Sequence, residues 1–213
     1  MKTRPLLTAA LTAVLLLTAP LYTAASNKTD SSEFRFRGYT GGMMLHSGYI
    51  QSGRFQLHSG SGTEPVTMQI KGGATGIGGH VKFAFGTSTD MLRIGAEGHS
   101  SNVSYRPSPS YSHTGWGGLL VDYIHRSKSS VHPFIGFLVG GGGVKNHIIA
   151  EGSTDDFITE PQAAMHRYAF MAVAPFVGME VSLTPKLCLV VKADWLLNAT
   201  SRQNDFSSGL RLY

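Results

Sequence analysis

The sequence predicts an all-β fold, an eight-stranded antiparallel up-and-down transmembrane β-barrel. Three observations predict it. In eight segments, apolar residues alternate with small or polar residues, which is the period of side chains along a β-strand. The connections between these segments are alternately long and short. Beyond its first residues, the chain holds no apolar run of the roughly 20 residues that a membrane-spanning helix needs.

Residues 1–25 are predicted to be a cleaved signal peptide. A basic start at Lys2 and Arg4 precedes a short apolar run, residues 6–17, and small residues follow. The apolar run is too short to cross a membrane as a helix. The rest of the chain, residues 26–213, is predicted to be one barrel domain.

The composition excludes several classes of protein. The single cysteine, Cys188, rules out an intramolecular disulfide and is predicted to lie inert inside the barrel. The formal net charge is +5, and it falls by two when Lys2 and Arg4 leave with the signal peptide, which gives a weak attraction to anionic surfaces. Because the sequence carries no nucleic-acid-binding motif, no nucleic acid partner is expected.

The clearest alternation forms a hairpin over residues 115–143. Leu119, Val121 and Tyr123 share one face of its first strand, and Asp122 is the only charge on the other face. A polar turn follows, and the second strand repeats the pattern. Its apolar row is Val131, Pro133, Ile135, Phe137 and Val139.

Six further segments with this alternation complete the barrel. In the first strand Phe34 and Phe36 are predicted to face outward, and Arg35, Arg37 and Tyr39 inward. The outward residues of the last strand are Phe206, Leu210 and Leu212. The eight predicted strands are residues 33–45, 76–85, 92–99, 117–124, 131–140, 168–181, 187–197 and 206–213.

The connections give the barrel a direction. Residues 47–73, about 101–114 and about 144–166 are predicted to be long loops, and the intervening connections are short turns. Residues 41–42, two glycines, are predicted to form a bulge. Bacterial outer-membrane barrels have short periplasmic turns and longer extracellular loops. If the N-terminus starts in the periplasm, every short turn falls on the periplasmic side, which favours a membrane barrel over a soluble one.

The inward faces collect ten charged side chains. An eight-stranded barrel is just wide enough for side chains to fill, so buried ions must pair with one another. A structural charge network in the lumen is therefore predicted, and a proton or ion path is the alternative. The predicted network comprises Arg35, Arg37, Lys82, Arg93, Glu97, Asp122, Glu180, Lys192, Asp194 and Arg211.

Histidines and loop carboxylates are the candidate metal ligands of the sequence. Clustered imidazoles can bind a transition metal or sense pH, but no ligand spacing occurs along one strand, so no metal is predicted. The histidines that map near the predicted extracellular rim are His46, His99, His113, His147 and His166. The acidic residues of the third loop are predicted to be solvated without bound calcium. They are Glu151, Asp155, Asp156 and Glu160.

The pattern of strands and turns resembles that of the small outer-membrane β-barrel proteins of Gram-negative bacteria, the OmpA/OmpX-like transmembrane barrels. Residues 41–46 (Gly-Gly-Met-Met-Leu-His) and 116–120 (Trp-Gly-Gly-Leu-Leu) also resemble uncharacterised barrel proteins of the Bacteroides group. The resemblance implies the barrel fold and a location in the cell outer membrane, and it brings no assigned activity. The expected partners are outer-membrane lipid, lipopolysaccharide and the barrel insertion machinery. We expect a monomer without a cofactor.

One tetrapeptide suggests an enzymatic alternative. His99-Ser100-Ser101-Asn102 resembles the His-x-Ser-Asn signature of outer-membrane lipid A deacylases, which are also eight-stranded barrels. This chemistry would need His99 as the base for Ser101 and an acid such as Glu97 or Asp122 to orient it. The predicted register turns His99 into the lumen, whereas that enzyme works on its lipid-facing wall.

The preferred prediction is a non-enzymatic outer-membrane barrel that presents surface loops, for envelope structure or surface contact. The alternatives are a lipid A deacylase-like hydrolase that uses His99 and Ser101, a narrow porin-like channel, and a soluble lipocalin-like barrel. A soluble barrel would need a polar outer face, unlike the apolar rows predicted here.

Overall fold

The computed structural model describes residues 33–57, 66–104, 110–126, 128–150, 162–184, 187–200 and 203–213. The predicted signal peptide, residues 1–25, lies outside them. The strands belong to one compact unit, Phe34–Tyr213. None of the described residues belongs to a helix that is long and apolar enough to cross a membrane.

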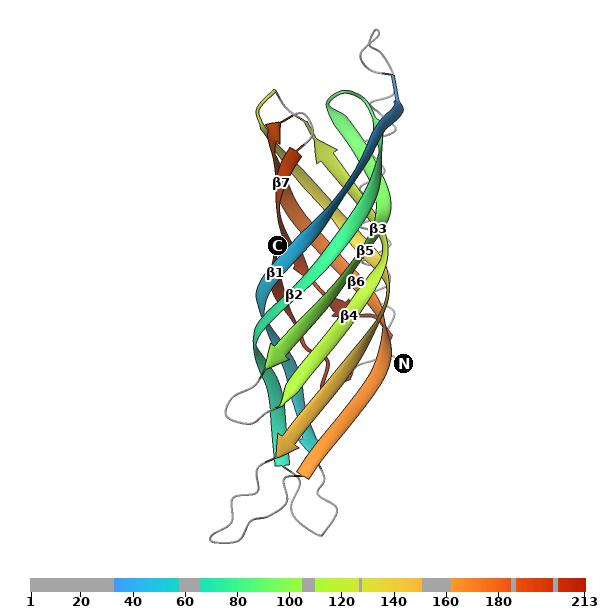
Figure 1. Cartoon of the computed structure of the whole chain (residues 1–213). Helices are drawn as coiled ribbons and strands as arrows, with labels where there is room; N and C mark the ends of the chain where they lie inside the picture. The colour runs from blue at the N-terminus through green and yellow to red at the C-terminus, as the bar shows by residue number, and fades with distance from the viewer. Residues whose placement is uncertain are drawn as a thin grey trace. The chain divides into compact units, whose positions relative to one another are not determined.

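The strands form one antiparallel sheet that closes on itself (Figure 1). From β1 to β7 each strand pairs with the next, β7 also pairs with β9, and β9 pairs with β1, which closes the ring. β7 and β8 both pair with β6, one after the other, and together they form one strand of the ring. The ring therefore has eight strands, as predicted. The strands are β1 (Arg35–Leu57), β2 (Val66–Gly86), β3 (Asp90–Ser104), β4 (Tyr111–His125), β5 (Val131–Ala150), β6 (Gln162–Thr184), β7 (Leu187–Trp195), β8 (Leu197–Asn198) and β9 (Ser208–Leu212).

The strands are longer than predicted. The prediction of a loop over residues 47–73 is wrong, because β1 continues to Leu57 and pairs there with the start of β2. Ile50, Ala74 and Val103 are buried against one another, so β1 continues to contribute to the interior in this segment. The glycine and serine residues between Ile50 and Ala74 hide the alternation of apolar and polar residues in the sequence.

The other two loops are also shorter than predicted. β3 runs to Ser104 and β4 starts at Tyr111, both inside the predicted loop 101–114. β5 continues through its glycines to Ala150, with Gly140 opposite Ala172 and the pairing unbroken. The acidic residues of the third loop lie outside the described residues: Glu151, Asp155, Asp156 and Glu160.

The predicted alternation between outward and inward residues is confirmed along the strands. In β4, Leu119 is 70% exposed, whereas Leu120 and Ile124 are fully buried. Outward residues of the other strands include Met43, Leu45, Phe83, Ile94, Ile135, Val177, Leu189, Trp195 and Leu212, and all are exposed. The outer wall is therefore apolar around the ring.

A bulge reverses the faces of β1 earlier than predicted. The register shifts between Phe36 and Gly38, and not at residues 41–42, and Gly38 has a φ of 124°, which favours glycine. Because of this shift Tyr39 faces outward and is 77% exposed, so its predicted inward orientation is wrong.

Three local features also differ from the predicted pattern. β7 and β8 are separated at Leu196, and their pairing with β6 is interrupted between Phe176 and Val173, a stretch that contains Pro175, which has no N–H to donate. Phe206 packs inward against Phe170, with ring centroids 4.9 Å apart, although it is predicted to face outward. Cys188 is exposed and is not a lumen filler.

Apolar side chains fill much of the interior in separate layers. One cluster contains Leu120, Ile124, Phe134 and Phe176, and a second contains Trp116, Leu138, Val144, Phe170 and Leu196. These layers exclude water from the polar residues that share the lumen, so every buried charge needs a partner inside the protein or bound water.

Two adjacent glycines of β5 provide a test of this packing. A Cβ on Gly140, which faces inward, would collide with the backbone of Gly117 and Gly118 on β4. On Gly141, which faces outward, the nearest atom would be the carbonyl oxygen of Phe170 at 3.9 Å. We expect Gly140→Ala to lower the free energy of unfolding by about 1–3 kcal/mol and Gly141→Ala to leave it nearly unchanged. Urea titration in detergent micelles, followed by tryptophan fluorescence, measures both; equal losses would contradict the packing described.

Candidate functional site

Nine charged side chains are buried among the described residues. One of them, Asp205, belongs to a polar cluster near the loop end that is described below. The other eight all belong to the predicted lumen network, and cations and carboxylates are equal in number among them. They are Lys82, Arg93, Glu97, Asp122, Glu180, Lys192, Asp194 and Arg211. The other two residues of the predicted lumen network lie outside the buried set. Arg35 is exposed, and Arg37 is half-buried, with its Nε donating to the carbonyl oxygen of Gly86 at 2.8 Å.

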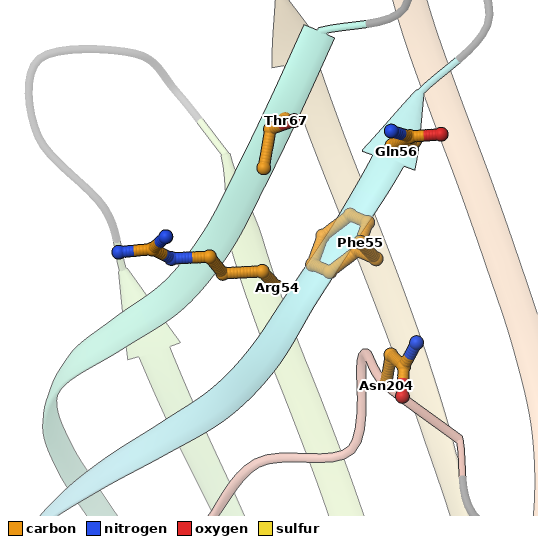
Figure 2. A pocket seen from close by; sticks show the side chains of 5 residues that line it. All are labelled: Arg54, Phe55, Gln56, Thr67 and Asn204. Atoms are coloured by element: carbon orange, nitrogen blue, oxygen red, sulfur yellow. The ribbon is translucent and has the colours of Figure 1, made fainter.

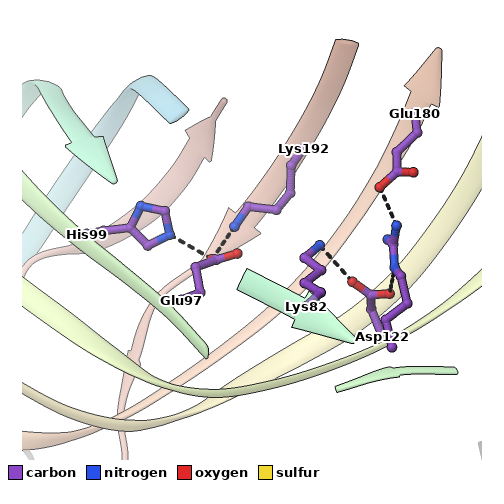
Figure 3. Close-up of polar contacts among 7 residues, drawn as sticks. Lys82, Glu97, His99, Asp122, Glu180 and Lys192 are labelled. Atoms are coloured by element: carbon purple, nitrogen blue, oxygen red, sulfur yellow. Dashed lines mark hydrogen bonds and ion pairs between the residues drawn. The ribbon is translucent and has the colours of Figure 1, made fainter. Parts of the chain in front are cut away.

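The first group of charges joins four strands around Asp122 (Figure 3). Lys82 Nζ on β2 donates to Asp122 Oδ2 at 2.8 Å, and Arg93 Nε on β3 donates to Asp122 Oδ1 at 2.5 Å. The far side of the guanidinium, Nη1, donates to Glu180 Oε1 on β6. Both cations lie 5.3 Å from the centroid of Phe134 on β5. The group therefore ties together a large part of the ring.

The second group crosses the barrel. Glu97 Oε1 on β3 accepts a hydrogen bond from Lys192 Nζ on β7 and lies 2.6 Å from His99 Nε2 (Figure 3). β3 and β7 are on opposite sides of the ring. The contact is therefore a strut between opposite walls, fully enclosed by other side chains.

Aromatic side chains surround the second group. Arg211 is fully buried on β9 with its guanidinium 4.8 Å from the Trp116 ring, and its nitrogens have no hydrogen-bond partner among the described residues. The Tyr213 hydroxyl donates to Asp194 at 2.7 Å. The Tyr213 ring lies 4.9 Å from that of His99. Rings and charges together occupy the lumen at this level, as expected for an eight-stranded barrel.

His99 and Ser101 do not form a nucleophile and base pair. Both are buried inside the barrel, and His99 Nε2 contacts Glu97. The Ser101 hydroxyl has no hydrogen-bond partner among the described residues, so no bond joins it to His99. Serine hydrolases require this bond and an accessible scissile group.

The five predicted rim histidines do not gather in one place. His46 and His99 are inside the barrel, with ring centroids 5.9 Å apart. His113 contacts Asn102, His147 stacks on Tyr111, and His166 contacts Asp205. Within the described ranges, no three His, Cys, Asp or Glu side chains are grouped so that they could hold a metal ion.

A polar cluster near the loop end was not predicted. Asn146 is fully buried, accepts from the Ser112 hydroxyl at 2.6 Å and donates to Asp205 Oδ2 at 2.9 Å. His166 Nδ1 lies 2.6 Å from the same carboxylate. The inward parity of β5, continued past its glycines, would have identified Asn146.

The last connection also packs on β1. Arg54, Phe55, Gln56, Thr67 and Asn204 line an open depression at the end of the β1–β2 hairpin (Figure 2). Gly53 permits the approach, because a Cβ there would come within 2.9 Å of the carbonyl oxygen of Asn204. The one charged side chain in this lining, Arg54, is exposed.

No protein-family model and no curated protein matches the sequence. Among solved structures, the chain is similar to Ail, the attachment invasion locus protein of Yersinia pestis, solved in complex with the heparin analogue sucrose octasulfate. The identity is 11% and the TM-score 0.42, over 82% of this chain and 94% of Ail. It is also similar to Neisserial surface protein A (NspA), with 14% identity and a TM-score of 0.43 over 80% and 96% of the two chains. The eight-stranded ring rests on the strand pairing of this chain itself.

The strut between Glu97 and Lys192 can be tested with a double-mutant cycle. Lys192→Met leaves a buried carboxylate without its cation, so we expect a loss of about 3–5 kcal/mol in the free energy of unfolding. Adding Glu97→Gln removes that unpaired charge and should recover most of the loss. Lys71→Met, on the exposed outer wall, is the control and should change stability by less than about 0.5 kcal/mol. Urea titration in lipid vesicles gives all three values; a small effect of Lys192→Met would show that the strut does not stabilise the barrel.

Proposed function

We propose that this protein spans the outer membrane of a Gram-negative cell as a non-enzymatic β-barrel and presents its longer connections at the cell surface. The role would be envelope structure or surface contact. The observation that supports this proposal is the apolar outer wall of a closed ring of strands. The mature chain would act as a monomer, delivered by the barrel insertion machinery.

The outer wall is unsuited to water. Met43, Leu45 and Leu119 are 81%, 77% and 70% exposed, and similar residues continue around the ring. Soluble monomers rarely expose a contiguous apolar patch larger than a few hundred Å². A soluble barrel would carry polar residues on this face, whereas here the face is apolar around the ring and eight charged side chains are buried inside. Lipid is the solvent that fits an apolar exterior and a polar interior.

The strands extend beyond the region that lipid would cover. A membrane-spanning strand needs about 9–11 residues, whereas β1 and β6 have 23 each. Toward the loop end, the outward residues change from Leu119 and Val139 to polar ones such as Asn102 and Lys145. The hairpins would therefore project from the membrane and hold the surface connections on rigid stems.

Heat modifiability tests the membrane proposal. A folded barrel in the outer-membrane fraction should migrate differently on SDS gels with and without boiling. Leu119→Lys puts a charge in the apolar wall and should cost about 2–4 kcal/mol of folding in lipid, so the unboiled folded band should weaken. Asn102→Lys, on the outer wall beyond the apolar region, is the matched control and should fold normally. A soluble protein without a gel shift would refute the proposal.

The proposed absence of enzymatic activity has its own test. No feature of the described residues favours the deacylase alternative over the non-enzymatic barrel, because His99 is engaged with Glu97 and not with Ser101. Ser101→Ala should leave the acylation of lipid A unchanged, as measured by mass spectrometry of extracted lipid A from cells with and without the protein. Loss of an acyl chain that depends on Ser101 would establish the hydrolase instead.

A further inference from the structure

Three basic side chains lie side by side on the outer wall of β4, β5 and β6. His113 is directly opposite Lys145, and Lys145 is directly opposite Arg167. We call these three residues the basic row. Side chains that are directly opposite in an antiparallel pair have Cβ atoms about 4.5–5.5 Å apart, and like charges there repel each other. Such an arrangement favours a bound anion.

No carboxylate of the described residues neutralises the basic row. Lys145 Nζ lies 5.7 Å from the centroid of the Tyr111 ring, and His113 Nδ1 lies 2.7 Å from Asn102 Oδ1. The described carboxylates are elsewhere, either in the lumen, at the turn end or bonded to Asn146. They are Glu33, Asp90, Glu97, Asp122, Glu180, Asp194 and Asp205.

The basic row lies just beyond the apolar wall. On β6 the outward apolar residues before Arg167 are Met171, which is 44% exposed, and Ala169. From Ala169 to Arg167 the strand rises roughly 7 Å, or about 5 Å along the membrane normal at the usual strand tilt. With the hydrocarbon ending at Ala169, Arg167 and Lys145 lie at the level of lipid headgroups, which extend about 5–7 Å beyond the hydrocarbon on each side. Beyond Arg167, the outward Met165 is 54% exposed.

The wall between the row and the apolar belt is smooth. Two residues from the basic row toward the apolar belt, the outward positions of β4, β5 and β6 are Gly115, Gly143 and Ala169, which lie opposite one another. A Cβ on Gly143 would meet only the carbonyl oxygen of Tyr168, at 3.8 Å, so no side chain projects there. A headgroup could therefore lie flat against the strands while the cations hold its charge.

We propose that Lys145 and Arg167, flanked by His113, bind a phosphate group of a lipid in the leaflet around the loop end of the barrel. This inference rests on the proposed function, because it needs the barrel to be in a membrane. Arginine matches phosphate oxygens with two parallel N–H groups, and lysine adds a point charge. Bound phosphate removes the repulsion between the two cations and anchors the barrel at a fixed depth. In an outer membrane with the short turns in the periplasm, this lipid is lipid A.

Lipid binding by the purified, folded protein in detergent tests the site. The probes are bisphosphorylated lipid A and lipid A without phosphates, and native mass spectrometry measures the bound fraction. Each Lys or Arg near an anionic membrane surface contributes about fivefold to binding. The double variant Lys145→Gln/Arg167→Gln should therefore bind the phosphorylated probe about 30-fold more weakly and the dephosphorylated probe as the unmodified protein does.

A matched variant separates the site from general charge. Arg54→Gln/Lys71→Gln removes the same charge from the exposed outer face of β1 and β2, and it should change lipid A affinity by less than about twofold. Equal losses in the two double variants, no loss in either, or equal binding of the dephosphorylated probe would each overturn the site.

The gel shift on boiling keeps the two proposals distinguishable. If all variants retain the shift but none discriminates phosphorylated lipid A, only the lipid site fails. If the unmodified protein shows no shift and needs no detergent, the membrane function fails first. A loss of the shift in Lys145→Gln/Arg167→Gln alone would mean that the two cations are needed for folding, which would also overturn the site.

Discussion

Closure of the sheet is the constraint on which the rest of the structure depends. With β1 joined to β9 and β5 joined to β6, the backbone hydrogen bonds of the wall are made within the sheet. Each residue then has only two environments, the lumen or the outer surface, and strict alternation assigns them. Side chains fill much of the narrow lumen, so buried charges pair with one another, either on neighbouring strands, as Asp122 does, or across the ring, as Glu97 does.

The presence of buried ion pairs is weak evidence for stability. Removing charges from water is costly, and a well-packed apolar replacement of an ion pair is often neutral or stabilising. The strut from Glu97 to Lys192 nevertheless joins strands far apart in the sequence. If the register of β3 or β7 slipped by one residue, one of the two side chains would turn to the outer face and the other would be left in the lumen without its ion-pair partner. We infer that the network helps to specify a single register in the closed ring.

The outer wall divides into layers that match different surroundings. Apolar residues such as Leu119 form the belt, a smooth glycine strip follows, and cations such as Lys145 stand beyond it. In the proposed membrane, the same strands would supply the lipid-facing surface, the headgroup-level surface and the stems of the projecting hairpins. This division would explain why β5 and β6 are longer than a membrane requires.

The sequence by itself determined the number of strands, their faces and their connectivity, because a period of two is local information. It could not set the strand ends, since glycine and serine between Ile50 and Ala74 hide the period while the backbone pairing continues. The sequence also could not predict the position of the bulge at Gly38, because a bulge depends on the pairing with the opposing strand. Only the tertiary structure decided which charges meet: Lys192 reaches Glu97, and Lys145 stands beside Arg167, through strand register that no local pattern encodes.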